Sequence, residues 1–143
     1  MSSYKAKQVI VVRRDLKMRK GKIAAQAGHA CVEATLAAIV RQGRAGQLRA
    51  TDDAWVYLEH AEDDRSTLTD WFDAGVAKIC VYVDSEEELL DIAQQGREAG
   101  FIVAIIRDAG HTEFHGEPTI TCIAFEPLLP DQIDPITGEL PLY

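Results

Sequence analysis

Apolar runs and amphipathic segments alternate along this chain. Four runs rich in β-branched and other apolar residues are predicted as strands, at residues 7–13, 77–84, 101–108 and 119–126. The first run is continuous rather than alternating, which is typical of a central parallel strand covered on both faces. We therefore predict a four-stranded sheet with this strand in its interior.

Three segments between these runs have the pattern of helices. Residues 21–43 combine Ala with long side chains and end at Gly43, which predicts a helix of about six turns. The segment after Asp63 offers N-cap residues and predicts a short helix up to Gly75. Ser85 precedes three consecutive Glu residues, so it is expected to cap a helix that ends at Gly100.

Two segments carry no clear pattern. Residues 44–60 are hard to interpret, although 54–58 could form a short apolar segment, and residues 128–143 form a Pro-rich tail. Strands that alternate with helices indicate a three-layer α/β/α sandwich with a mostly parallel four-stranded sheet. At 143 residues, the chain is expected to be a single domain over residues 1–143.

Composition narrows the class of protein. No apolar run approaches the length of a membrane span, and the N-terminus has too short an apolar core for a signal peptide, so we expect a cytoplasmic protein without a membrane partner. The three cysteines are widely spaced in apolar settings. We expect buried free thiols at Cys31, Cys80 and Cys122.

Positive charge is concentrated at the N-terminus. Residues 1–22 hold eight of the 15 Lys and Arg and one of the 23 Asp and Glu, a balance of +7 against −15 for the rest of the chain. This asymmetry predicts an anionic partner for one face, with a solvated charged loop as the alternative. Six of these cations fall within ten residues: Arg13, Arg14, Lys17, Arg19, Lys20 and Lys22.

The cationic loop joins the first predicted strand to the first predicted helix. In open α/β sheets, ligands bind beyond the carboxyl ends of strands, where helix N-termini present unpaired N–H groups to anions. The segment lacks the spacing of a phosphate-binding P-loop, and no GxGxxG occurs in the chain. Binding of a nucleotide cofactor therefore has little support, and we expect no cofactor.

One stripe of the first predicted helix is polar. Lys22, Gln26, His29 and Glu33 fall within an arc of about 60°, and the adjacent side of the helix is apolar. Each polar residue alone could be a solvated or structural side chain. Their alignment with the cationic loop favours a binding surface.

A second group of candidate residues follows the third predicted strand, in the segment IRDAGHTEFHGE. It contains Asp108, His111, Thr112, Glu113 and His115. We interpret this group as a site in which a carboxylate and a hydroxyl act together with an ammonium group. Two alternatives remain open: a metal site at His111 and His115 with Asp108 or Glu113, and an Asx-type turn closed by Asp108 and Thr112.

These segments resemble the archaeal and eukaryotic type of peptidyl-tRNA hydrolase. The resemblance rests on KQVIVVRRDLKMRKGKIAAQAGHACVEA and on the order VDSEEELLDI, IRDAGHT and DPITGELPLY, which covers roughly residues 7–40 and 75–143. It implies an α/β/α fold with a mixed four-stranded sheet, frequent homodimers, and metal-independent hydrolysis of the ester that joins a peptide to tRNA. Residues 44–70 are longer and more divergent than the family pattern.

The resemblance also assigns residues. Lys22, Asp108 and Thr112 match the catalytic candidates of the family, and Gln26 and His29 match its polar pocket. The binding of tRNA phosphates would involve Arg14, Lys17, Arg19, Lys20 and His111. A tRNA-binding or regulatory protein without turnover and an unrelated small-molecule hydrolase remain alternatives.

Three positions depart from the family pattern. His111 replaces an expected Arg, Glu113 replaces an expected Gln, and FEPLLP replaces a Gly-Pro-rich turn.

Overall fold

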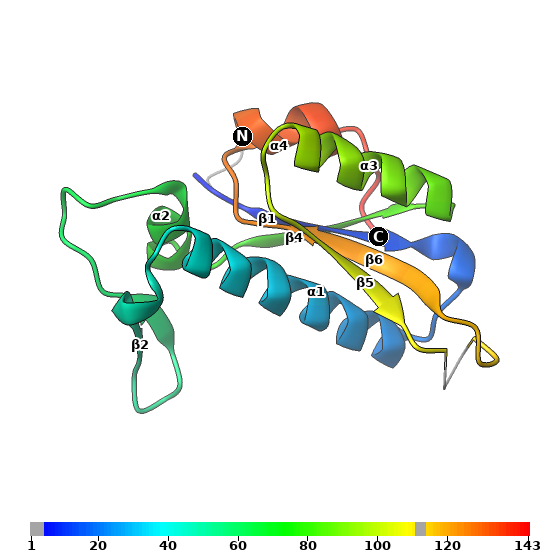
Figure 1. Ribbon diagram of the computed structural model, residues 1–143, viewed down its shortest axis with the longest axis horizontal. Helices are drawn as coiled ribbons and strands as arrows, with labels where there is room; N and C mark the ends of the chain where they lie inside the picture. The colour runs from blue at the N-terminus through cyan, green and yellow to red at the C-terminus, as the bar shows by residue number, and fades with distance from the viewer. Residues whose placement is uncertain (1–4, 111–113) are drawn as a thin grey trace.

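Four strands form the main sheet of the molecule. The computed structural model describes residues 5–110 and 114–143. Figure 1 shows the sheet, whose strand order is β4 (Lys78–Val83), β1 (Gln8–Arg13), β6 (Thr119–Phe125) and β5 (Val103–Asp108). The four predicted strands are thereby confirmed to within two residues at each end, and the predicted interior position of the first strand is confirmed.

The strand directions correct one part of the prediction. β1 is parallel to β4, whereas β6 is antiparallel to both β1 and β5. The sheet is therefore mixed, and its description as mostly parallel is wrong, because one of the three pairings is parallel. The physical reason is the length of the connection between β5 and β6, residues 109–118, because a parallel pair needs a crossover of about a dozen residues or more.

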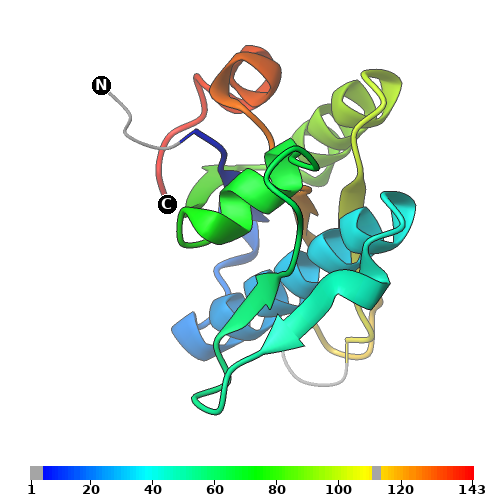
Figure 2. The same cartoon turned by 90° about the vertical axis from the view of Figure 1, so that its left-hand side faces the viewer.

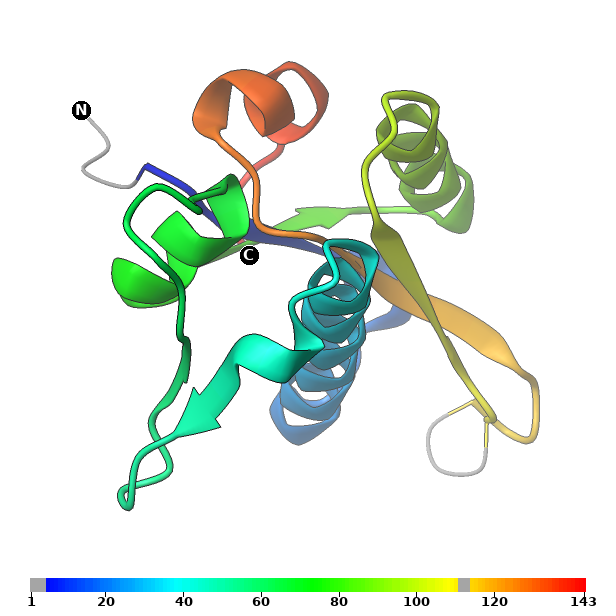
Figure 3. The same ribbon diagram turned by 60° about the vertical axis from the view of Figure 1, so that its left-hand side comes forward.

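Helices cover both faces of this sheet (Figure 3). Ile10 and Val12 of β1 point to the face covered by α1 (Lys20–Arg41), whereas Val9 and Val11 point to the opposite core. That opposite face is covered by α3 (Glu86–Glu98) and α4 (Pro130–Thr137). A strand that buries both of its faces needs a continuous apolar sequence, which explains the run in β1.

The long helix α1 confirms the predicted six-turn helix. Gly43 follows it with a φ of 69°, a left-handed conformation that glycine adopts at little cost. Its apolar side, Ile23, Ala27, Ala30 and Cys31 among others, packs on the sheet as predicted. In the described part of the chain, α1 is the one helix long and apolar enough to span a membrane by composition. It packs on β1, β5 and β6 by one face, and Val32, Leu36 and Val40 on its other side are exposed.

A hairpin occupies residues 44–60, which have no clear sequence pattern, and a short helix follows it. β2 (Leu48–Ala50) and β3 (Val56–Leu58) form an antiparallel pair that projects from the main body (Figure 2), preceded by the 3-10 turn η2 (Ala45–Gln47). The predicted helix before Gly75 is confirmed as α2 (Thr67–Asp73), capped by Ser66.

The Pro-rich tail is ordered by tertiary contacts. Pro130 opens α4, which the sequence did not predict; proline is well suited to the first turn because that turn needs no N–H donor. After α4, Tyr143 donates its backbone N–H to the Cys80 carbonyl, and Tyr82 donates to the Pro141 carbonyl. The tail therefore pairs with the outer edge of β4.

Candidate functional site

A short ion pair joins two distant segments at one end of the sheet. Lys22, in the first turn of α1, places its Nζ 2.6 Å from Oδ1 of Asp108, the last residue of β5. Their side chains are 16% and 11% exposed, so solvent reaches only a small part of each. The predicted convergence of Lys22 and Asp108 is therefore present in the structure.

The backbone around Asp108 fixes the orientation of its carboxylate. Its second oxygen, Oδ2, accepts the N–H of Gly110 at 2.8 Å. Gly110 has a φ of 88°, and a Cβ there would lie 2.4 Å from the Glu117 carbonyl oxygen, so only glycine fits. The Phe114 ring lies 5.9 Å from Lys22 Nζ, at the edge of cation–π range. The ion pair thus lies between the turn at Gly110 and the Phe114 ring.

Gln26 lies one turn after Lys22 and is anchored to β6. The buried Thr121 hydroxyl donates to Gln26 Oε1 at 2.7 Å, which leaves the amide nitrogen as the group that can donate to a ligand. Thr121 is skipped in the strand register, because Ile106 pairs with Cys122 and Arg107 with Ile120. Thr121 was missed in the sequence, where it reads as an ordinary strand residue; only the register irregularity marks it.

Cys122, next to Thr121, is a buried thiol that stays neutral. Its thiol donates to the Gln26 carbonyl at 3.4 Å, and burial raises the pKa of Cys122 to about 12. Burial also raises the pKa of Cys31 and Cys80. The predicted free thiols are confirmed, with Cys80 only partly buried.

His29 shares the polar stripe of α1 but not the ion pair. It is 54% exposed, and its Nε2 lies 2.9 Å from Glu33 Oε1. It follows Lys22 by almost two turns, which is about 10 Å along the helix axis. His29 and Glu33 therefore form a surface pair at some distance from Lys22 and Asp108.

The two arginines that end β1 and begin η1 (Arg14–Leu16) are held by carboxylates. Arg13 binds Asp15 at 2.7 Å and donates to the Ile120 carbonyl at 3.1 Å. Arg14 donates to Asp84 at 3.0 Å and stacks 3.9 Å above the Tyr82 ring; the hydrogen bond to Asp84 raises the pKa of Arg14. Much of their charge is compensated within the protein.

The other predicted phosphate contacts gather at the start of α1. Lys17, Arg19 and Lys20 are exposed, and Arg19 occupies the N-cap position without a side-chain cap bond. The first turn of α1 contains no acidic residue. Cations at a helix N-terminus oppose the helix dipole. A bound anion would interact favourably with these cations and with the positive end of the dipole.

Three residues of the predicted site lie outside the part of the chain that the structure describes: His111, Thr112 and Glu113. Within residues 5–110 and 114–143, no group of three or more His, Cys, Asp or Glu side chains could hold a metal ion. The alternative metal site at His111 and His115 depends on residues outside this range.

Comparisons with known proteins agree on one family. The family model described as "Peptidyl-tRNA hydrolase PTH2" matches residues 6–143. A peptidyl-tRNA hydrolase of Methanocaldococcus jannaschii is 40% identical over 137 residues, covering 95% of this chain and 98% of that protein. A probable peptidyl-tRNA hydrolase 2 of Drosophila melanogaster is 38% identical over 136 residues, covering 95% of this chain and 61% of that protein.

The fold has a distant counterpart among solved structures. A protein of unknown function from Agrobacterium tumefaciens strain C58 superimposes with a TM-score of 0.51 at 14% identity, covering 98% of each chain. At this identity, the likeness concerns the fold alone. Since the family model spans nearly the whole sequence and the relatives match at about 40% identity, the chain belongs to the peptidyl-tRNA hydrolase PTH2 family.

Proposed function

We propose that this protein hydrolyses the ester of peptidyl-tRNA at the Lys22–Asp108 pair, with Thr112 as the third member of the catalytic group. The family and the names of its relatives support the reaction. The single observation that carries the assignment of residues is the 2.6 Å pair, nearly buried beneath an uncapped, cationic helix N-terminus.

The geometry suits different roles for Lys22 and Asp108. The Lys22 ammonium is a cation with three N–H donors, and it can stabilise the oxyanion that forms on the ester carbonyl. Asp108 accepts hydrogen bonds from both Lys22 and Gly110, which stabilise its charged form. A carboxylate stabilised in this way is better suited to orienting the attacking water than to removing its proton.

The tRNA would be held by groups around this pair. Gln26 can donate its amide N–H groups to the substrate, and the uncapped first turn of α1 can bind a phosphate. We also assign contacts with the tRNA to His111 and to exposed side chains of α1 and of the loop before it: Arg14, Lys17, Arg19, Lys20 and His29. No cofactor or metal takes part in this scheme.

The same proposal includes the organisation of the molecule. A single domain over residues 1–143 and a three-layer α/β/α sandwich are supported by α1 on one sheet face and α3 with α4 on the other. A homodimer rests on the family resemblance alone, and a cytoplasmic location rests on the pattern of apolar runs in the sequence.

The test is the release of peptide from an N-blocked aminoacyl-tRNA by purified variants. Lys22→Ala should lower kcat by about two to three orders of magnitude, the effect of losing one oxyanion donor. Asp108→Asn should have a comparable effect, and the double substitution should cost much less than the product of the two, because the residues act together.

A matched control exists on the opposite side of the molecule. Lys7 and Asp134 form a similar pair at 2.7 Å, in which the Lys7 side chain is 14% exposed. Lys7→Ala should leave kcat unchanged. Full turnover by Asp108→Asn would contradict the proposed roles, and inactivation by EDTA with recovery on adding zinc would favour a metal mechanism. Tight tRNA binding without turnover in the wild type would identify a non-catalytic binding protein.

A further inference from the structure

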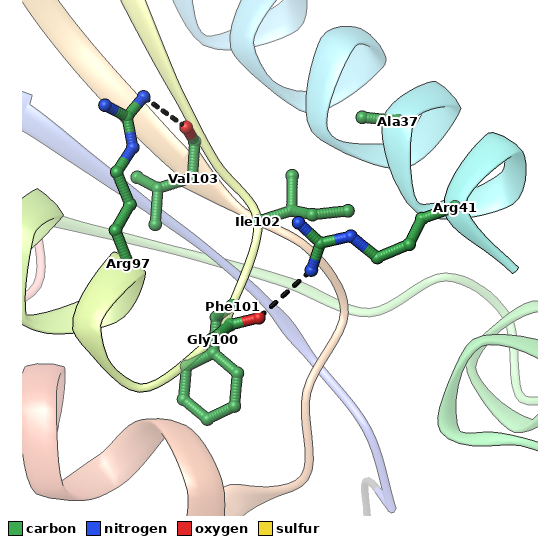
Figure 4. A pocket seen from close by; sticks show the side chains of 7 residues that line it. All are labelled: Ala37, Arg41, Arg97, Gly100, Phe101, Ile102 and Val103. Atoms are coloured by element: carbon green, nitrogen blue, oxygen red, sulfur yellow. Dashed lines mark hydrogen bonds between the residues drawn. The ribbon is translucent and has the colours of Figure 1, made fainter.

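An open pocket of about 410 Å³ lies at the end of the sheet opposite to Asp108. Figure 4 shows its lining, which comes from the ends of α1 and α3 and from the start of β5: Ala37, Arg41, Arg97, Gly100, Phe101, Ile102 and Val103. The two arginines reach over the same stretch of backbone from different helices. No part of the proposed catalytic group lines this pocket.

Both guanidinium groups are oriented by backbone carbonyls. Arg41 Nη1 donates to the Gly100 carbonyl at 3.0 Å, and Arg97 Nη2 donates to the Val103 carbonyl at 2.9 Å. A guanidinium has five N–H donors in a planar fork, so each arginine keeps several donors for a ligand. Planar forks of this kind suit phosphate and carboxylate oxygens.

The pocket has an excess of positive charge. The Glu126 carboxylate lies 4.0 Å from Arg41 Nη1 and accepts the Ile102 N–H at 2.6 Å. Arg97 makes no ion pair with any residue of the described ranges. Two cations thus face one carboxylate, in a protein whose net charge is −8. A bound anion would neutralise this excess of positive charge.

We propose that Arg41 and Arg97 bind a backbone phosphate of the tRNA, remote from the ester. This inference rests on the proposed function, which supplies a polyanionic substrate. β5 connects the two places: Val103 opens the strand at the pocket, and Asp108 ends it at the ion pair, about 17 Å away. β5 is an edge strand of the sheet, and the exposed Arg107 lies on it between the two sites. The phosphate chain of the tRNA follows this edge.

A purely structural role makes a different prediction. Arg41 and Arg97 lie in the last turns of α1 and α3, where cations stabilise a helix by interacting with its dipole. Removing such cations would lower the melting temperature without changing the affinity for tRNA. The two roles are therefore distinguished by binding and not by stability.

The experiment compares full-length proteins at a temperature where all of them are folded. Arg41→Gln combined with Arg97→Gln should weaken binding of uncharged tRNA about tenfold, the effect of losing charge-assisted hydrogen bonds. It should also flatten the plot of log affinity against log salt by about 0.9, for one lost phosphate contact. KM for whole peptidyl-tRNA should rise about tenfold, whereas KM for a short oligonucleotide ester that ends at the 3′ nucleotides should not.

Matched variants make the test specific. Arg49→Gln with Arg65→Gln removes the same charge from the hairpin and from the start of α2, and it should leave affinity and salt slope unchanged. Arg41→Lys with Arg97→Lys keeps the charge and should restore most of the salt slope. An unchanged tRNA affinity in the glutamine variant of an active enzyme would overturn this site alone. A wild type that neither binds nor hydrolyses peptidyl-tRNA would overturn the proposed function as well.

Discussion

Lys22 and Asp108 are 86 residues apart in the chain, and their contact depends on how β5 ends. The register irregularity after Ile106 and the tight turn at Gly110 direct the carboxylate towards α1. A substitution at Gly110 would change the orientation of the Asp108 carboxylate more than the packing of the core. At the scale of single residues, the site is built by backbone features of β5 and β6.

Two other residues show that the helical period alone does not predict tertiary contacts. Gln26 and His29 share one stripe, yet Gln26 binds the buried Thr121 whereas His29 binds the exposed Glu33. The helical period places both on one side of α1 but does not say which of them meets a strand. The reason is that Gln26 is half-buried where α1 packs on β6, whereas His29, three residues further along, is exposed.

His60 provides a test of pH dependence. Its Nδ1 lies 2.8 Å from the Ala61 carbonyl oxygen and its Nε2 lies 3.0 Å from an Asp73 carboxylate oxygen. The protonated ring donates to both, and these two hydrogen bonds raise the pKa of His60, while burial opposes them. A raised folded-state pKa contributes stability that is fully present below the unfolded value of about 6.5. That stability is lost as the pH rises through the folded-state pKa. Wild type should therefore lose its advantage over His60→Gln as the pH rises.

The measurement is urea unfolding of both proteins between about pH 5 and pH 9. The difference between them isolates His60, because the other titrating groups are shared. Asp73→Asn should reduce the pH dependence without abolishing it, since the bond to Ala61 remains. A difference that is constant across this pH range would show that His60 does not couple protonation to folding.

Helix N-termini differ in a way that separates structure from function. α3 begins with the cap Ser85, which accepts the Glu88 N–H at 3.0 Å, and three Glu residues occupy its first turn. α1 begins without a side-chain cap and with Lys20 and Lys22 in its first turn. The first arrangement stabilises a helix by itself, whereas the second opposes the helix dipole and is compensated by anionic groups such as the Asp108 carboxylate or a bound phosphate. This contrast at the element scale supports the assignment of the site to α1.

Close packing of α3 on the sheet can be tested with a single methyl group. A Cβ at Gly96 would lie 2.4 Å from Phe125 Cε1 and 2.8 Å from Val103 Cγ2. Gly96→Ala should therefore lower the free energy of unfolding by about 1–3 kcal/mol through overpacking. Gly28→Ala is the matched control, because nothing lies within 4 Å of a Cβ there, and it should stabilise α1 by roughly 0.5–1 kcal/mol. Chemical denaturation measures both, and a stabilising Gly96→Ala would contradict this packing.

At the scale of the whole molecule, the charge of the N-terminal segment is divided between two roles. Arg13, Arg14 and Lys22 are engaged with carboxylates of the same chain, whereas Lys17 and Lys20 have no ion pair within residues 5–110 and 114–143. The balance of +7 therefore overstates the charge available to a partner. Phosphate binding by this surface depends mainly on the exposed lysines.

Lys17→Gln with Lys20→Gln should accordingly weaken binding of tRNA and flatten its salt dependence. Each lost contact reduces the slope by about 0.7 for single-stranded and about 0.9 for duplex regions. Arg13→Gln is the control, because this side chain already binds Asp15 and the Ile120 carbonyl. Titrations of uncharged tRNA over a range of salt concentrations give both slopes. If Arg13→Gln changed the slope more than the double lysine variant did, this division of charge would be wrong.

The sequence by itself determined the elements whose signals are local. Continuous apolar runs identified the four strands, the Ser85 cap and Gly100 delimited α3, and the Ala-rich pattern with Gly43 delimited α1. Motifs at Lys22 and Asp108 identified the family and named both members of the ion pair. These features depend on neighbouring residues in the chain, and a sequence displays such neighbours directly.

Tertiary structure alone decided the features that depend on distant partners. The position of β6 between β1 and β5, and with it the mixed sheet, follows from strand pairing rather than from any residue of β6. The three-residue strands β2 and β3 are too short for a periodic pattern, and α4 forms where the tail packs against the sheet. The hydrogen bond between Thr121 and Gln26 and the presence of Arg41 and Arg97 in the lining of one pocket likewise involve residues far apart in the chain. Such arrangements exist only after the sheet and helices have assembled.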